Sequence, residues 1–265
     1  MKEQLSTVHF VDNYLIRPTN PIMVNLIGAG GTGSQVLSAL ARINHSLLAL
    51  EHPGLFVRVF DDDKVTTANL GRQLFSASEI GMNKAVALIN RINRFFGTNW
   101  KAIDSKFHKE INAENQLATI TISCVDKVSA RFEICEMLQK VHMRNIIEAH
   151  MPIYWMDFGN GQYTGQVILS TVVNVKQPTS KKYRTISNLP LITEEFKNLF
   201  EQTDEDNEPS CSLAEALTKQ DLFINSALAN VGGSLLWSMF REGMICNRGF
   251  FLNLKDFRSQ PLPVG

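Results

Sequence analysis

The sequence contains no long apolar run and no excess of charge of either sign. None of its apolar stretches reaches the roughly 18 residues that a membrane span requires, and the N-terminus carries charges without an apolar signal core. Lys plus Arg and Asp plus Glu both total 26 in a chain of 265 residues, so no net field attracts nucleic acid or an anionic membrane. We therefore expect a cytoplasmic protein that binds neither nucleic acid nor membrane.

Cysteine is also sparse. The chain has four cysteines and no C-x-x-C pair; they are Cys124, Cys135, Cys211 and Cys246. This wide spacing argues against a zinc ribbon and against a disulfide framework. The hydrophobic share of 44% and the charged share of 20% are ordinary, and a chain of this length can bury a substantial core.

A glycine-rich turn organises the first third of the chain. An apolar run at 23–27 leads into G-A-G-G-T-G-S, and apolar residues then recur at helical spacing to about Leu50. A strand, turn and helix of this kind place backbone N–H groups and the positive end of the helix dipole against a phosphate. The first glycine lets the strand turn, the middle two let the backbone approach the phosphate, and the last lets helix and strand pack closely. The candidate phosphate-binding residues are Gly28, Gly30, Gly31, Gly33 and Ser34.

Polar residues follow the next predicted strands. The run Leu55–Phe60 predicts a second strand, and three aspartates (61–63) stand at its carboxyl end, where open α/β sheets bind ligands. The stretch N-L-G-R-Q comes next, and Lys84 lies in the first turn of the following helix. A cation opposes the dipole there, which hints at a bound phosphate. A later strand, at 119–125, ends at Asp126.

The alternation of strands and helices predicts a Rossmann-like, doubly wound and mostly parallel sheet with helices on both faces. We expect a long helix from Cys211 to roughly Phe240, in which Gly232 and Gly233 mark close packing or a kink. A final edge strand is expected at 250–254, followed by a frayed end. The chain then divides into an N-terminal arm (1–20), a nucleotide-binding core (21–175), a crossover loop (176–211) and a C-terminal helix with its edge strand (212–265).

In this order, the motifs resemble those of the ThiF/MoeB superfamily, whose members are ATP-dependent activators of ubiquitin-like and sulfur-carrier proteins. Within it, the chain is most similar to the ThiF-family member of the PRTRC gene cluster (ParB-related, ThiF-related cassette). The resemblance covers roughly residues 20–245 and is carried by the segments 28–34, 61–63, 69–73, 80–84 and 123–126 and by Cys211.

The resemblance implies a role for each matching residue. Asp61 binds the ribose of ATP, with Asp63 beside it. Cationic side chains bind the triphosphate and offset its charge, and neutral ones add hydrogen bonds; these are Arg72 and Lys84, and Asn69 and Gln73. Asp126 holds Mg²⁺, a cation that prefers oxygen ligands. Cys211, expected at a helix N-terminus where the dipole favours the thiolate, accepts the activated carrier as a thioester or persulfide. The implied catalytic residues are Arg72, Lys84, Asp126 and Cys211.

The implied activity is adenylation of the C-terminal carboxylate of a small ubiquitin-like (β-grasp) carrier by a homodimeric enzyme. Two alternatives stay open. The glycines also satisfy G-x-G-x-x-G, which is typical of NAD-dependent oxidoreductases. A non-catalytic scaffold of the same fold would explain three departures from the family: Ser123 replaces an aspartate, the zinc cysteines are missing, and no N-terminal arginine motif is present. Cys211 as a nucleophile and Cys211 as an incidental loop cysteine are both open, and the sequence identifies neither the carrier nor the final acceptor.

Overall fold

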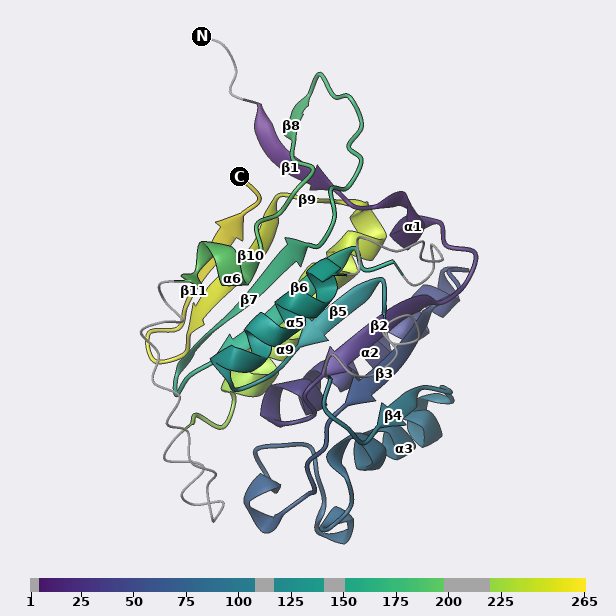
Figure 1. Ribbon diagram of the computed structural model, residues 1–265, viewed down its shortest axis with the longest axis vertical. Helices are drawn as coiled ribbons and strands as arrows, with labels where there is room; N and C mark the ends of the chain where they lie inside the picture. The colour runs from purple at the N-terminus through teal and green to yellow at the C-terminus, as the bar shows by residue number, and fades with distance from the viewer. Residues whose placement is uncertain (1–4, 108–116, 141–150, 198–219) are drawn as a thin grey trace.

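The computed structural model describes residues 5–107, 117–140, 151–197 and 220–265 (Figure 1). In chain order, the elements of its first half are β1 (Ser6–Phe10), α1 (Asn13–Ile16), β2 (Ile22–Ile27), α2 (Gly31–Ala49), β3 (Leu55–Phe60), η1 (Thr67–Asn69), η2 (Ala77–Glu79), α3 (Lys84–Phe96), β4 (Lys101–Ile103) and β5 (Ile120–Ser123). The elements of its second half are α5 (Val128–Lys140), β6 (Tyr154–Asn160), β7 (Thr164–Thr171), β8 (Tyr183–Thr185), α6 (Ile192–Glu195), α9 (Ile224–Glu242), β9 (Met244–Ile245), β10 (Asn247–Asn253) and β11 (Arg258–Pro263).

The centre of the molecule is an eight-stranded sheet with the order β11-β10-β7-β6-β5-β2-β3-β4. From β4 to β6 the neighbouring strands are parallel, and from β6 to β11 they are antiparallel. The parallel half confirms the predicted Rossmann-like architecture. Because its strands run in one direction, β2, β3, β5 and β6 end at the same edge of the sheet, and this is where α/β folds bind ligands.

Helices cover both faces of the sheet. On one face, α2, α3 and α9 bury their apolar residues in one cluster with β2, β3, β5 and β6. On the other, α5 and α6 pack over a smaller cluster that includes Phe60, Trp155 and Ile168. Figure 1 shows α5 in front of the central strands and α9 behind them. Adjacent residues of one strand serve different faces, as the pleat requires: Leu26 belongs to the first cluster and Ile27 to the second.

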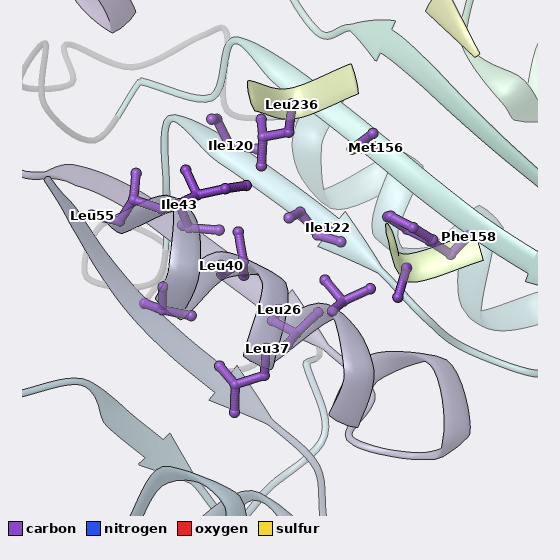
Figure 2. Packing of buried hydrophobic residues seen from close by; sticks show 14 of the residues in the cluster. Leu26, Leu37, Leu40, Ile43, Leu55, Ile120, Ile122, Met156, Phe158 and Leu236 are labelled. Carbon is purple, nitrogen blue, oxygen red and sulfur yellow. The ribbon is translucent and has the colours of Figure 1, made fainter. Parts of the chain in front are cut away.

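The larger cluster fixes the position of α2 (Figure 2). Leu37 and Leu40 are at most 1% exposed, and Ile43 is buried with them. Their spacing of three residues places them along one stripe of the helix, which lies over Leu26 and Ile122 of the sheet. Since α2 starts directly after the glycine turn, this packing also fixes the turn at the edge of the sheet.

The last helix begins later than the sequence predicts. We expected a helix from Cys211, but α9 starts at Ile224, and Cys211 lies outside the described residues. The expected close packing at the glycine pair is present, because a Cβ at Gly232 would lie 2.5 Å from the ring of Phe158. The helix ends at Gly243, which has φ +64° and caps it in the left-handed conformation that glycine adopts without cost.

Two strands near the ends of the described chain, β1 and β11, were not predicted from the sequence. The N-terminal arm contains β1, which pairs with β8 and β9 in a small separate sheet. At the C-terminus the prediction of a frayed end is wrong, because β11 forms the outermost strand beyond β10. Val264 is buried there and donates its N–H to the carbonyl of Cys246 at 3.0 Å. Among the described residues, no helix combines the length and apolar character that crossing a membrane requires.

Candidate functional site

The glycine turn lies at the carboxyl edge of the sheet, between β2 and α2. Gly28 has φ +90°, and a Cβ there would lie 2.6 Å from the carbonyl oxygen of Cys124, so the turn tolerates only glycine. A Cβ at Gly33 would lie 1.9 Å from the carbonyl oxygen of Gly28, which is the predicted close packing of helix on strand. Among the described residues, nothing lies within 4 Å of the position that a Cβ at Gly30 would occupy. The described part of the chain therefore leaves space for a ligand above Gly30.

Asp61 anchors the turn from the neighbouring strand. Its Oδ2 accepts the N–H of Ala29 at 2.6 Å and its Oδ1 accepts the N–H of Asp63 at 2.9 Å. Burial raises the pKa of Asp61, while the bond from Ala29 and the charge of Lys84 act against that rise. The two backbone bonds hold the carboxylate in one orientation, and each oxygen retains a lone pair for a further donor.

Lys84 lies beside the aspartates, as the sequence suggests. It is the first residue of α3, whose N-cap is Asn83. Its Nζ contacts Oδ2 of Asp63 at 2.7 Å, and the Lys84 side chain is only 10% exposed while that of Asp63 is 66% exposed. Asn83 also donates to the carbonyl of Asp61 at 2.8 Å. The start of α3 is thus fastened to the end of β3.

Arg72 approaches the turn from the loop between η1 and η2. Its Nη1 donates to Oε1 of Gln220 at 2.6 Å, and its Nε is buried without a hydrogen-bond partner in the described part of the chain. Burial lowers the pKa of this guanidinium, although an arginine remains charged at neutral pH. A buried donor without a partner costs free energy, which an incoming anion would offset.

The remaining predicted polar residues hold this loop in shape. Asn69 accepts the N–H of Thr66 at 2.8 Å in a capping box at η1. Ser34 is buried, and its hydroxyl donates to the carbonyl of Gly31 and accepts the N–H of Leu74. Gln73 is buried, and its Oε1 has no partner among the described residues. Ser34 therefore joins the Arg72 loop to the glycine turn through bonds within the protein.

Asp126 lies on the exposed link between β5 and α5. Arg131 fixes the backbone on both sides of it, donating to the carbonyl of Val125 at 2.7 Å and to that of Lys127 at 3.3 Å. The sequence analysis missed Arg131, whose partners become apparent only in the fold. Of the groups of three or more potential metal ligands in the described residues, none includes Asp126; one such group is Asp61 to Asp63, with its ligand atoms within 4.8 Å of one another.

Ser123 stands where the family resemblance expects an aspartate. Its hydroxyl donates to Oδ1 of Asp157 on the adjacent strand β6 at 2.5 Å. Asp157 is completely buried and also accepts from Arg131 at 3.0 Å. The carboxylate at this place therefore belongs to Asp157 of the adjacent strand β6, and Arg131 neutralises its charge.

The described cysteines fall into two groups. Burial raises the pKa of Cys135, and desolvation raises that of Cys124 well above its ordinary value, with the charge of Asp157 adding to the rise. Both therefore remain thiols at neutral pH and make poor nucleophiles. Cys246 is exposed. Cys211 lies outside the described residues, and because α9 begins at Ile224, it does not stand at the N-terminus of that helix.

Comparison with known proteins identifies the family of the chain. The model of the ThiF family matches residues 16–244. Ubiquitin-like modifier-activating enzyme 5 of Drosophila erecta is 32% identical over 126 residues, which cover 42% of this chain and 29% of that protein. The chain therefore spans less than a third of this relative.

Two solved structures share the fold. PaaA has a TM-score of 0.59 and 16% identity, with 92% of this chain and 64% of PaaA covered. Escherichia coli MccB, solved with MccA, has a TM-score of 0.57 and 13% identity, with 95% of this chain and 65% of MccB covered. MccB solved with ATP gives a TM-score of 0.55 at 13% identity and the same coverage. Since the family model covers most of its residues, the chain belongs to the ThiF family.

Proposed function

We propose that this protein binds MgATP at the glycine turn and adenylates the C-terminal carboxylate of a small ubiquitin-like carrier protein. We further propose, from the sequence resemblance, that it belongs to the PRTRC branch and acts in the cytoplasm. Membership of the ThiF family supports the activity, and MccB has been solved with ATP. The observation that carries the proposal concerns Arg72, whose loop is bonded to the turn: its Nε is buried and has no hydrogen-bond partner among the described residues.

The phosphates would lie between the start of α2 and the two cations. Backbone N–H groups at a helix N-terminus bind phosphate, and the space above Gly30 leaves them accessible. Arg72 offers its Nε, which has no acceptor in the described part of the chain. Lys84 already contacts Asp63, but an ammonium group has three donors and can hold a carboxylate and a phosphate together.

Asp61 would accept the ribose hydroxyls with its remaining lone pairs. Its two backbone bonds keep the carboxylate in place before the nucleotide arrives. Asp126 fits as an oxygen ligand of Mg²⁺, since this ion is usually bound by one or two carboxylates together with substrate phosphates. When bound, the metal would offset phosphate charge, and Arg131 would keep the backbone around Asp126 in position.

The reaction needs no proton transfer. An oxygen of the carrier carboxylate, ionised at neutral pH, attacks the α-phosphorus of ATP. The bond between that phosphorus and the bridging oxygen breaks, the electron pair leaves with pyrophosphate, and an acyl-adenylate results. The contribution of this chain is to position the two reactants and to stabilise charge in the transition state. Passage of the carrier to Cys211 would be a separate, later step.

ATP–pyrophosphate exchange tests the proposal. The full chain is assayed with MgATP, with and without small glycine-terminated proteins from the same gene neighbourhood. We expect carrier-dependent exchange that Arg72→Ala abolishes and that Arg94→Ala, which changes an exposed arginine of α3, leaves intact. MgATP binding without exchange for any carrier would favour the scaffold, and a melting temperature raised by NAD but not by ATP would favour the oxidoreductase.

We also propose that the protein forms a homodimer. Large apolar side chains remain exposed on the helices, including Phe95 at 80% and Leu48 at 53%, and apolar surface of this kind favours association. Light scattering at micromolar concentration should give twice the mass of the chain. A purely monomeric mass would remove any expectation of residues donated across an interface.

A further inference from the structure

A buried asparagine on α9 joins the glycine turn to Arg72. Asn225 is 1% exposed, and its side-chain amide forms hydrogen bonds with three polar side chains of the described residues. Its Oδ1 accepts from Oγ1 of Thr32 and from Nδ2 of Asn160, each at 2.8 Å. Its Nδ2 donates to Oε1 of Gln220 at 3.0 Å. A buried amide with its partners satisfied has one orientation, so it can fix the groups around it.

Gln220 links Asn225 to the arginine through hydrogen bonds. The same Oε1 that accepts from Asn225 also accepts from Nη1 of Arg72 at 2.6 Å. Gln220 is neutral, unlike the aspartate that contacts Lys84. An amide oxygen therefore holds the guanidinium at one corner without cancelling its charge, whereas a carboxylate would bind it as an ion pair. The bond to Gln220 therefore leaves the positive charge of Arg72 uncancelled.

The position of Asn225 is also fixed against the turn itself. A Cβ at Gly31 would lie 2.6 Å from Nδ2 of Asn225. The side chain of Asn225, from α9, therefore fills the space beside Gly31, whose backbone is predicted to approach the phosphate. One asparagine thus contacts the first turn of α2 and the residue that holds Arg72.

We propose that Asn225 is a positioning residue that, through Gln220, orients Arg72 toward a phosphate group bound at the glycine turn. This inference rests on the proposed function and adds to it two residues, Asn225 and Gln220, that act without touching the nucleotide. Removing the side chain of Asn225 or of Gln220 leaves Arg72 charged but lets its guanidinium rotate away from the glycine turn.

A double-mutant cycle with calorimetry of MgATP binding tests this inference. The full chain is compared as wild type, Asn225→Ala, Arg72→Ala and the double variant. We expect Asn225→Ala to weaken binding about tenfold, or about 1.4 kcal/mol, because Arg72 would keep its charge but lose its orientation. In the Arg72→Ala background it should add no further loss, because the effect passes through the arginine. A fully additive loss would show that Asn225 acts on the turn alone and would overturn the proposal.

The chain offers a second variant and a matched control. Gln220→Ala removes the link to Arg72 at a partly exposed position, so it tests the same path if Asn225→Ala fails to fold. Asn230→Ala changes an exposed asparagine of the same helix, whose Nδ2 donates to Ser226 of α9 itself, and it should bind MgATP like the wild type. Arg72→Ala weakening MgATP binding while the Asn225 and Gln220 variants do not would refute the inference and leave the proposed function standing. A wild type that binds no MgATP would refute both.

Discussion

The hydroxyl of Ser123 donates a hydrogen bond of 2.5 Å to the carboxylate of Asp157, across the parallel pair β5 and β6. Both residues are completely buried. The same hydroxyl accepts the indole N–H of Trp155 at 2.7 Å, and Arg131 balances the charge of the carboxylate. A serine here is therefore part of a satisfied polar network, and an aspartate in its place would bring a second carboxylate beside the first.

We expect Ser123→Asp to destabilise the protein. The new carboxylate would be buried beside Asp157 with no cation of its own, and an uncompensated buried charge costs about 3 to 5 kcal/mol. Urea denaturation measures the free energy of unfolding. Ser123→Ala is the control: it leaves the indole N–H of Trp155 without an acceptor, which costs about 1 to 3 kcal/mol. An aspartate variant as stable as the wild type would show that Asp157 and Arg131 do not set this position.

The burial of Asp61 predicts a pH dependence of stability. Burial raises the pKa of its carboxyl group, so the folded state keeps the proton to higher pH than the unfolded state, where the pKa is about 3.9. The contribution of Asp61 to the free energy of unfolding therefore falls as pH rises from that value through the higher folded pKa. Asp61→Asn removes this titration. The stability of the variant relative to wild type should then increase with pH in that window, as urea denaturation at a series of pH values would show.

The test depends on how the difference in the free energy of unfolding between Asp61→Asn and wild type changes with pH. The hydrogen bonds that the variant loses change this difference by a constant amount. Asp104→Asn, at a different aspartate, controls for the change of overall charge. A difference that is constant with pH, or that declines as pH rises, would contradict the assignment of the shift to burial.

Nucleotide affinity tests the residues at the ends of β3 and α3. Asp61→Ala removes the acceptor proposed for the ribose and also releases the N–H of Ala29 from its bond. Lys84→Ala removes a positive charge that is nine-tenths buried. Each change should weaken MgATP binding at least tenfold, or about 1.4 kcal/mol, in calorimetry. Lys101→Ala, at an exposed lysine of β4, should bind normally. Unchanged affinity in both folded variants would remove the nucleotide site from this edge.

Sequence reasoning predicted the parallel half of the fold because local signals define it. The strand at Leu55–Phe60 has the predicted ends, since an apolar run lies between a turn and the aspartates. The antiparallel edge was harder to predict. Pro261 and Pro263 suggested an unstructured end, but an outermost strand tolerates proline because its outer N–H groups need no partner. The strand β1 could not be predicted locally, because it pairs with β8 and β9, which lie far away in the sequence.

The residues of the candidate site divide in the same way, into those that local sequence signals predict and those that only the folded structure reveals. Residues at strand ends could be predicted, because parallel strands end at one edge of the sheet. Asn160 shares this signal, since it ends β6, and it could have been found in the same way. Gln220 and Asn225 could not, because their importance depends on contacts with Arg72 and Thr32. The residues around them in the sequence predict only that an apolar helix begins nearby.

The final prediction separates adenylation from transfer to a cysteine. The residues proposed for adenylation contain no sulfur, so Cys211→Ala should retain carrier-dependent pyrophosphate exchange. It should lose any reducible or thioester-linked adduct with the carrier. Since α9 begins at Ile224, the dipole of that helix does not activate this thiol, and Cys211 would have to react from the segment before it.

The described cysteines supply the control. Cys124 and Cys135 have raised pKa values and are held as thiols, whereas Cys246 is exposed. Cys246→Ala should therefore keep both exchange and adduct. Intact mass spectrometry and non-reducing gels of the enzyme mixed with carrier and MgATP would distinguish the cases. An adduct that survives Cys211→Ala but not Cys246→Ala would make Cys246 the acceptor. If no protein forms an adduct while exchange continues, then Cys211 is not an acceptor and the adenylate passes directly to a downstream nucleophile.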